Sequence, residues 1–502
     1  MAAQAENVEL IWEKIVNEVK ELLENPVAGG VPFYEEKGRT HPRTVTGTFR
    51  SLKSWTTILL LGWWHLAPFL RWDRGPGAPD QAILVDMAGR RAYFFFIEIW
   101  PQEVYYLTGL LLIAAISLFL MSALAGRVWC GFICWQTVYT DIFISIERLF
   151  LGDRNRRLVL SKARWNLEKL VRLGLVNLAC LGVSALCGIS FVLYSGDAPH
   201  ELLAILTGQA TTTSYGVITV VGGLCFLLAG HARERVCIYV CPYSRFQAAM
   251  SDEHSLVVSY EAWRGEPRGH VKAADHGEKG KYAFEGRGHC VDCNMCVQVC
   301  PTNTDIRRGS QLSCIGCGLC IDACNTVMDH FGLPRGLVSY DSCANQLARS
   351  TNSGSNFNLV RPRTVIYAVM IAAIGIVMLV SLMTRADVRV DVLHDRAPLA
   401  VELGGGRIRN GYDYKILNMA RQPRKFTLRL SGIAGAKLDI VGGTKGQEQA
   451  DLLVGADTVG SVRVYVTAEI FGDDLRNRPL TFVLKDETGT VEIDSQTFFA
   501  LP

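Results

Sequence analysis

Cysteine is missing from the last third of the chain. All sixteen cysteines lie between Cys130 and Cys343, and residues 344–502 contain none. This excludes a disulfide-stabilised tail, so the stability of that part must come from its own hydrophobic core. Because disulfides form in oxidising compartments and free thiols persist in reducing ones, the split indicates that the cysteine-rich part faces a reducing compartment and the tail an oxidising one.

Three other features are absent or weak. The first fifty residues are polar and charged, so we expect no cleavable signal peptide. No G-x-G-x-x-G loop, P-loop or nucleophile–base motif occurs, which leaves no sequence argument for nucleotide binding or hydrolysis. The net charge of +3 is too small to indicate nucleic acid as a partner.

Apolar residues, in contrast, are abundant and occur in blocks. They make up 49% of the 502 residues, and the mean hydropathy is positive. This predicts a membrane protein with soluble segments. We expect five membrane spans, at about 54–71, 102–125, 170–194, 212–230 and 364–384. The first and fourth are shorter than the roughly 20 residues that a helix needs to cross.

The charges between these spans predict which side each loop faces. The stretch 126–169 is rich in Lys and Arg, whereas 195–211 has neither. The positive-inside rule therefore places the N-terminus, 126–169 and the cysteine-rich module in the cytoplasm, and the tail outside. Arg74, Arg90 and Arg91 fit less well, because they fall in a loop that this topology places outside.

The chain divides into five regions by composition. Residues 1–53 form a cytoplasmic segment, basic near its end, with an expected amphipathic helix at 6–24 that packs on a partner, on the membrane interface or on the chain's own cytoplasmic domain. Residues 54–251 form a membrane domain with four spans. Residues 252–363 form a linker and the cysteine-rich module, and 364–384 the fifth span.

Residues 385–502 alternate apolar and polar residues in short runs. The runs at 388–392, 428–430, 461–466, 481–484 and 490–499 predict strands, separated by turn residues at Gly404-Gly405-Gly406, Asn410-Gly411 and Gly442-Gly443. Six to eight strands in this length predict an antiparallel β-sandwich of immunoglobulin type. The predicted fold class is thus a five-helix membrane domain, a ferredoxin-like α/β module and an all-β tail.

The strongest motif is a tandem cysteine run. It reads Cys290-x2-Cys293-x2-Cys296-x3-Cys300-Pro301, followed by Cys314-x2-Cys317-x2-Cys320-x3-Cys324. Each half has the spacing of a bacterial ferredoxin, in which the fourth cysteine binds the other cluster. One [4Fe–4S] cluster is therefore expected on Cys290, Cys293, Cys296 and Cys324, and a second on Cys314, Cys317, Cys320 and Cys300. The alternative is a pair of zinc knots, but these usually combine two separated C-x2-C pairs.

Two further cysteine pairs lie near the membrane. Cys130-x3-Cys134 follows the second span and Cys237-x3-Cys241-Pro242 follows the fourth. On a helix, positions i and i+4 share a face, so each pair can direct two sulfurs at one centre. Paired soft thiolates favour Cu(I), Zn or iron–sulfur iron. The alternative is that all four are small buried residues; equal spacing at equal depth favours a metal or redox site.

Other cysteines and histidines carry weaker signals. Cys180, Cys187 and Cys225 lie within spans without such pairing and are interpreted as packing residues, and Cys343 is unassigned. His65 and His231 are candidates for haem or metal ligation because ionisable groups in spans are often functional. A single histidine on an apolar face is more often a hydrogen-bonded core residue, which is the favoured interpretation for both.

Several of these motifs together resemble those of the CcoG/FixG family, also called RdxA/RdxB, which are accessory proteins of cbb-type cytochrome c oxidases. The resemblance rests on RVWCGFICWQTV at 127–138, CIYVCPY at 237–243, RGEPRG at 264–269, the tandem cysteine run and GLPRGL at 332–337. It covers nearly the whole chain. Two residues depart from the pattern: Trp135 stands where the family usually has proline, and Asn325 follows Cys324 where ferredoxins often have proline.

The resemblance implies a bacterial inner-membrane cupric reductase that supplies Cu(I) for the copper–haem centre of the oxidase. Its tail would then be periplasmic, and its substrate copper would sit near Cys130, Cys134, Cys237 and Cys241. The implied partners are membrane lipid, a copper transporter or chaperone, oxidase assembly factors and an unidentified electron donor. A homodimer and an additional haem or quinone stay open.

Two alternatives also stay open. One is an electron-transfer subunit that exchanges electrons between ferredoxin clusters and a membrane quinone, as NapH-type proteins with C-x3-C-Pro pairs do. The other is a non-enzymatic assembly scaffold or redox sensor. Copper-independent reduction of the clusters by quinol would favour the first, and oxidase assembly without clusters the second.

Overall fold

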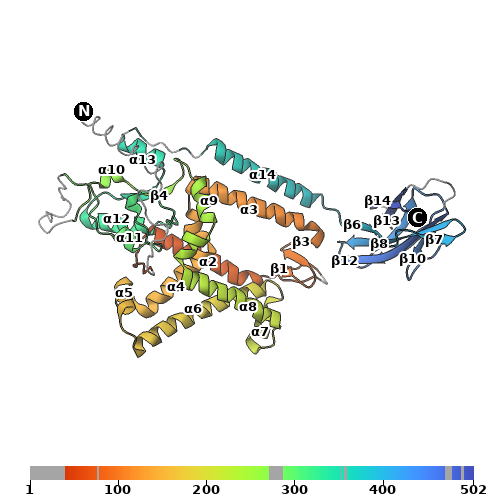
Figure 1. Ribbon diagram of the computed structural model, residues 1–502, viewed down its shortest axis with the longest axis horizontal. Helices are drawn as coiled ribbons and strands as arrows, with labels where there is room; N and C mark the ends of the chain where they lie inside the picture. The colour runs from red at the N-terminus through yellow and green to blue at the C-terminus, as the bar shows by residue number, and fades with distance from the viewer. Residues whose placement is uncertain are drawn as a thin grey trace. The chain divides into compact units, whose positions relative to one another are not determined.

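A computed structural model describes residues 40–501 except 76–77, 271–285, 352, 355–357, 359, 470–476 and 488–490. The predicted amphipathic helix at 6–24 lies outside the described residues. The chain forms two compact units, residues 1–376 and 377–502, which are described separately. Figure 1 labels most of the helices and many of the strands of both.

Among the described residues, four helices are long and apolar enough to cross a membrane. They are α3 (Val104–Ala125) with the preceding turn η2 (Pro101–Glu103), α6 (Leu167–Leu193), α8 (Thr212–Cys225) continued by η4 (Phe226–Ala232), and α14 (Pro362–Met383). These correspond to four of the predicted spans. The chain is therefore a membrane protein by the length and composition of its helices.

The first predicted span is not confirmed by this criterion. Its residues belong to α2 (Thr48–Leu66), followed by a short turn η1 (Ala67–Phe69). The helix carries Arg50 and Lys53 near its start and His65 near its end. These interrupt the apolar stretch, which is shorter than the roughly 20 residues that a span needs.

Shorter helices connect the long ones. α4 (Trp135–Leu151) and α5 (Arg154–Lys162) lead from α3 to α6, α7 (Ala198–Thr207) joins α6 to α8, and α9 (Tyr243–Met250) follows the π-helical turn η5 (Val236–Val240). Trp135 is the first residue of α4, a position where proline is favoured because its N–H would have no partner in the helix. The departure from the family pattern is thus compatible with a regular helix.

A three-stranded antiparallel sheet lies between α2 and α3. It comprises β1 (Ile83–Asp86), β2 (Arg91–Phe94) and β3 (Ile97–Ile99). Arg74 is buried here and donates to the carbonyls of Pro79, Gln81, Ala82 and Phe95. Arg91 pairs with Glu98 and stacks on Trp100. These arginines hold the sheet together, which explains why the loop is basic although the charge rule would place it outside.

The cysteine-rich module follows α9. Strands β4 (Val257–Tyr260) and β5 (Val338–Asp341) pair antiparallel and enclose α10 (Ala262–Gly265), α11 (Met295–Gln298), the turn η7 (Ile306–Arg308) and α12 (Leu319–Phe331). α13 (Cys343–Ser350) leads on to α14. Val258, Met328, Leu337 and Val338 are buried together with several cysteines. The module thus has a small core of its own built around its cysteines.

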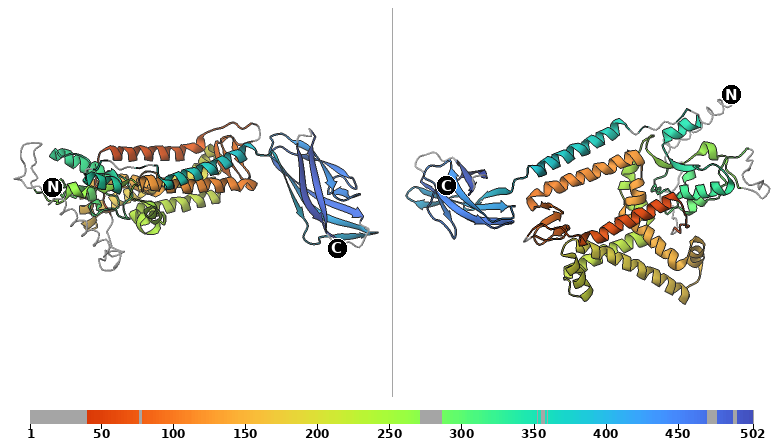
Figure 2. Two further views of the ribbon diagram at one scale, coloured as in Figure 1. Left: turned by 90° about the horizontal axis from the view of Figure 1, so that it is seen from above. Right: turned by 180° about the vertical axis from the view of Figure 1, so that it is seen from behind.

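Residues 377–502 form two packed sheets, which the views in Figure 2 show from two sides. One sheet has the order β10–β12–β8–β6, with β7 also on β8, and the other β11–β9–β13–β14. Their bounds are β6 Val388–His394, β7 Val401–Gly404, β8 Arg407–Asn418, β9 Arg424–Ser431, β10 Lys437–Ile440, β11 Gln449–Val454, β12 Thr458–Glu469, β13 Arg478–Asp486 and β14 Glu492–Phe499. All pairings are antiparallel. The predicted sandwich is confirmed.

One predicted turn in this unit is wrong. Asn410-Gly411 lies inside β8, not between strands. Asn410 is fully buried, and its amide donates to the carbonyl of Ala500. A Cβ at Gly411 would lie 2.2 Å from an Asp395 carboxylate oxygen. The pair therefore serves packing between strands, which an Asn-Gly sequence does not distinguish from a hairpin turn.

A buried ion cluster fixes the turn that follows α8. Glu147 on α4 accepts from Arg233 at 2.5 and 3.1 Å and from Arg157 at 3.3 Å, and all three side chains are almost fully buried. Arg233 has a positive φ of 45°, which is unfavourable for a residue with a Cβ. Its Nε also donates to the carbonyl of Gly230. The ion pair therefore holds a strained turn in place.

We predict that Glu147→Gln destabilises the protein strongly. It leaves two buried guanidinium groups without their carboxylate, which costs about 3–5 kcal/mol. Glu168→Gln, which removes the exposed pair with Arg172 on α6, is the matched control and should cost less than about 1 kcal/mol. Denaturant unfolding of the detergent-purified protein measures both, and equal stabilities of the two variants would contradict the assigned role of Glu147.

Candidate metal centres

Four cysteines line one cavity of the cysteine-rich module. Its walls include Cys290, Cys293, Cys296 and Cys324. Three come from the loop before and within α11, and the fourth from α12. We call these four residues the first site. They are the set expected on one cluster from the sequence.

Backbone conformation and one arginine shape the loop of the first site. Asp292 and Asn294 have positive φ values of 48° and 57°, which lets the loop turn around its cysteines. Arg307 donates to Asp305 at 2.8 Å, to Asp292 at 2.5 Å and to Asn294 at 2.6 Å. One side chain thus ties three points of the loop together.

The other four cysteines of the tandem run also gather. Cys300, Cys314, Cys317 and Cys320 interact electrostatically with one another. The Cys300 sulfur lies 3.3 Å from the Thr302 hydroxyl and accepts from the backbone N–H of Thr304, also at 3.3 Å. We call these four cysteines the second site. Sulfurs that accept N–H bonds are stabilised as thiolates, as cluster ligands must be.

Burial keeps the free thiols protonated. It raises the pKa of Cys296, Cys314 and Cys324 to about 12. Such thiols stay neutral at physiological pH unless a metal displaces the proton. Two gathered sets of four cysteines, largely shielded from water and one of them lining a cavity, therefore fit [4Fe–4S] clusters. Within the described parts of the chain, no three His, Cys, Asp or Glu side chains converge closely enough to hold a single metal ion.

The two membrane-edge pairs share one local structure. Cys130 lies in the π-helical turn η3 (Trp129–Ile133), which Cys134 ends, and Cys237 lies in the matching turn η5, which Cys241 ends. The N–H of Cys134 donates to the carbonyl of Trp129 at 2.9 Å, and that of Cys241 to Val236 at 2.8 Å. We call these four cysteines the thiol pairs. Short π-helical turns of this kind are frequent at functional sites.

The structure brings the two thiol pairs near each other. Burial raises the pKa of Cys130 to about 12, with further contributions from Cys134, Cys237 and Cys241. Burial likewise raises the pKa of Cys237 to about 12. The Cys130 sulfur also lies 3.1 Å from Oε1 of Gln247 on α9, to which it donates. Residues that are far apart in the sequence thus form one sulfur-rich region.

The second site packs directly on the first thiol pair. A Cβ at Gly131 would lie 2.7 Å from the carbonyl oxygen of Gly316 and 3.0 Å from the Cα of Cys317. Gly316 itself has a φ of 64°, and a Cβ there would lie 3.2 Å from the backbone of Arg127. The two backbones approach this closely only because both residues are glycine.

Arg127 joins the same elements. Its guanidinium donates to the carbonyl of Cys314 at 3.1 Å and also to those of Leu312 and Ser244. It therefore connects the end of α3, the second site and α9. Its charge also acts on Cys130 and Cys237, where it favours thiolates.

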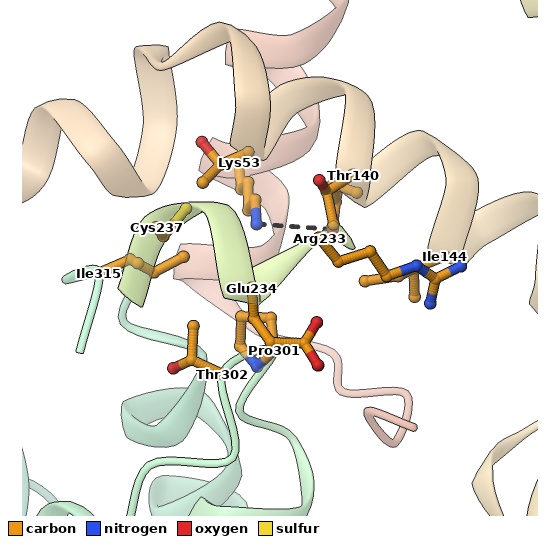
Figure 3. A pocket seen from close by; sticks show the side chains of 11 residues that line it. Lys53, Thr140, Ile144, Arg233, Glu234, Cys237, Pro301, Thr302 and Ile315 are labelled. Carbon is orange, nitrogen blue, oxygen red and sulfur yellow. Dashed lines mark ion pairs between the residues drawn. The ribbon is translucent and has the colours of Figure 1, made fainter. Parts of the chain in front are cut away.

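A small cavity lies beside Cys237 of the second thiol pair and is also lined by Pro301, Thr302 and Ile315, which neighbour cysteines of the second site in the sequence. Figure 3 shows Lys53 of α2 at this cavity, together with Glu234 and Cys237 from the turns after α8 and Pro301 and Thr302 from the module. Lys53 is buried and its Nζ lies 3.5 Å from Asp141 of α4. Arg50 donates to the same carboxylate at 2.8 Å.

The two candidate histidines, His65 and His231, do not lie among the residues of the cysteine sites. Nδ1 of His65 is 2.5 Å from the Ser190 hydroxyl near the end of α6, and His231 is exposed with its ring edge-on to Phe226. Cys180, Cys187 and Cys225 pack in a hydrophobic cluster with Tyr139 and Phe143. Cys343 is exposed at the start of α13.

Sequence reasoning missed several residues of the site. Lys53 and Arg50 were visible only as part of a basic stretch, and Asp141 had no distinguishing pattern. Arg127 and Gly131 lie close to Cys130 within the stretch 127–138, on which the family resemblance rests. Their membership of that motif is the sequence signal that could have identified them.

Comparisons with known proteins agree with this arrangement. Residues 232–343 match the family described as a 4Fe-4S dicluster domain, and 107–157 match a 4Fe-4S binding domain. The latter stretch contains only Cys130 and Cys134, fewer than the four ligands of a cubane. Residues 378–502 match the family described as an IG-like fold at the C-terminal of FixG. The chain is thus a membrane-bound iron–sulfur protein with an immunoglobulin-like tail.

Full-length relatives narrow the class further. Protein RdxA of Cereibacter sphaeroides is 42% identical over 440 residues, which cover 87% of this chain and 91% of the relative. Protein RdxB of the same organism is 43% identical, covering 87% and 90%. Nitrogen fixation protein FixG of Rhizobium meliloti is 40% identical over 464 residues, covering 87% of each. The chain belongs to the FixG/RdxA family, as its motifs predicted.

We predict that Gly131→Ala lowers the iron content of the second site. The new methyl group would overlap the Gly316 carbonyl and push the cysteine loop away, and overpacking of this kind costs about 1–3 kcal/mol. Gly182→Ala on α6, where a Cβ meets nothing within 4 Å, is the control. Iron and sulfide per chain, with EPR of the reduced protein, report the outcome; full iron content in Gly131→Ala would contradict the close contact.

Proposed function

We propose that this chain transfers single electrons from two [4Fe–4S] clusters to Cu(II) and thereby supplies Cu(I) for the copper–haem centre of a cbb-type cytochrome c oxidase. The first and second sites would hold the clusters, and bound clusters would supply one-electron redox chemistry over a tunable range of potentials. The observation that carries the proposal is the glycine contact between Gly131 and Gly316, which supports electron transfer from the second site to Cys130.

The thiol pairs suit the product of the reaction. Cu(II) gains one electron and becomes Cu(I), which soft thiolates bind better than hard ligands do. Each thiol must lose its proton when it binds copper, because Cys130 and Cys237 are protonated at neutral pH. Arg127 favours the thiolate form of Cys130 and Cys237.

We further propose that α2 crosses the membrane as a fifth span. At its start, Asp322 of the module accepts from the backbone N–H groups of Phe49 and Arg50 at 3.2 and 2.8 Å. At its end, the carbonyl of Trp64 accepts from Tyr194 at 3.0 Å, beyond the end of α6. α2 thus runs from the module to the C-terminal end of α6. If α2 is a span, the chain has five spans, so the module and the tail lie on opposite sides of the membrane, which supports a cytoplasmic module and a periplasmic tail.

The electron-transfer proposal predicts a large effect of the thiol pairs. In protein with both clusters intact, Cys130→Ala/Cys134→Ala should slow Cu(II) reduction at least tenfold, because the thiolates hold copper beside the second site. Cys343→Ala, which removes an exposed cysteine of unassigned role, should not. Stopped-flow mixing of anaerobically reduced protein with Cu(II), with a Cu(I) chelator as the readout, measures the rate.

Two results would count against this proposal. An unchanged rate in the double variant would remove the pair from the copper site. Rapid reoxidation of the clusters by a quinone, with no reaction with Cu(II), would favour the quinone-linked alternative.

The topology predicts opposite labelling of two cysteines. A membrane-impermeant maleimide should reach Glu448→Cys, an exposed position in the tail, in cells with a permeabilised outer membrane. It should reach Cys343 only after lysis, because that residue would face the cytoplasm. Mass spectrometry of the two peptides distinguishes them, and labelling of Cys343 in unlysed cells would reverse the proposed orientation.

A further inference from the structure

Charges of both signs surround the first site. Arg307 acts on Cys296 and is paired with Asp305 and Asp292. The exposed Arg43 lies with its guanidinium 3.1 Å from the sulfur of Met295, the neighbour of Cys296. Tyr260 faces Cys290 and donates to Glu266 at 3.2 Å. The buried Arg307 and the exposed Arg43 thus stand against two carboxylates next to the loop, with a third carboxylate, that of Glu266, hydrogen-bonded to Tyr260.

The charges around the second site are predominantly positive. Lys53 and Arg50 of α2 act on Cys317, and Arg127 acts on Cys314. Asp141 lies between the two α2 cations. Three cations therefore face this site against Asp141 and the Asp322 carboxylate, which is engaged with the N-terminus of α2.

Contacts of α2 fix these cations in place. Phe49 packs against Gly318 so closely that a Cβ there would lie 2.6 Å from the ring. The chain before α2 follows the module, where Arg43 N–H donates to the Gln298 carbonyl at 2.8 Å and the Thr40 hydroxyl to Pro301 at 3.1 Å. Lys53 and Asp141 line the same cavity as Pro301 and Ile315, the neighbours of Cys300 and Cys314.

We infer that Lys53, held by Asp141 and helped by Arg50, raises the reduction potential of the second site above that of the first. This inference rests on the clusters of the proposed function but not on copper as the acceptor. An added electron is stabilised by a nearby cation and destabilised by a carboxylate. Net charge near a cluster is one of the factors that set its potential.

Burial makes the effect of Lys53 large. Its side chain is 3% exposed, so water screens its charge only weakly. Exposed charges of the module, such as the Arg335–Asp329 pair, are screened and contribute little. Lys53 touches neither the electron donor nor the acceptor, and it acts only through the potential of the second site.

The difference in reduction potential between the two sites gives electron transfer a direction. Cys293 of the first site is exposed, so a one-electron donor of low potential can approach there. The second site is buried against the membrane domain and contacts the turn of Cys130 through Gly131. Electrons would enter at the first site, move to the second because its potential is higher, and leave towards the thiol pairs.

Opposite charge changes test this inference. In the anaerobically purified full-length protein, an EPR-monitored redox titration should resolve two potentials. Lys53→Met should lower the higher one and Asp141→Asn should raise it, each by about tenfold in the reduction equilibrium, or 59 mV for one electron. The lower potential should stay unchanged. In the double variant Lys53→Met/Asp141→Asn, the higher potential should return close to its wild-type value. Because this variant removes one charge of each sign, it still tests the inference if one of the single variants fails to fold.

A matched control separates charge from packing. Lys169 on α6 is also buried and donates to the carbonyls of Ser161 and Ala163, so Lys169→Met should leave both potentials unchanged. If Lys53→Met and Asp141→Asn both contain iron but shift the higher potential in the same direction, or do not shift it, this inference is wrong while the proposed function still stands. Protein without iron would overturn it together with the proposed function. Potentials that shift as expected in protein inert towards Cu(II) would support it and remove only the copper proposal.

Discussion

The distance between the membrane thiols and the iron–sulfur module is set by two glycines. Gly131 lies inside the turn that carries Cys130 and Cys134, and Gly316 lies inside the loop that carries Cys314 and Cys317. A side chain on either would separate two backbones that now touch. Because electron transfer needs close approach of donor and acceptor, the missing Cβ atoms matter as much as the cysteines themselves.

Buried polar groups hold this contact rigid. Arg127 bonds carbonyls of the module and of α9, Asp322 takes the first N–H groups of α2, and Glu147 fixes the Arg233 turn before Cys237. Buried charges are costly unless they have partners. Each of these three side chains finds its partners on an element that is distant in the sequence. The membrane domain and the module therefore behave as one body, in which charges on α2 can act on a cysteine site.

The sequence predicted the parts better than their junctions. Cysteine spacing predicted two sets of four cysteines, which gather in the structure, and alternation of apolar residues predicted the β-sandwich. Both signals are local. The family assignment followed from motifs and is confirmed by full-length relatives. Composition alone does not fix the number of spans, because α2 carries Arg50, Lys53 and His65 beside a short apolar stretch. Asn410-Gly411 was misassigned as a turn, since only the fold shows that Asp395 and Ala500 surround it. The partnership of Lys53 with Asp141 depends on tertiary packing and had no local signal.

The central claim is that eight cysteines form two cluster sites beside the membrane thiols. Quantification of iron, acid-labile sulfide and zinc in strictly anaerobic preparations of the full-length protein tests it most directly. Two cubanes per chain correspond to about eight iron and eight sulfide, and we expect that content together with negligible zinc. About two zinc ions per chain and no sulfide would contradict the account, because the protein would then have no redox centre from which electrons could reach Cys130.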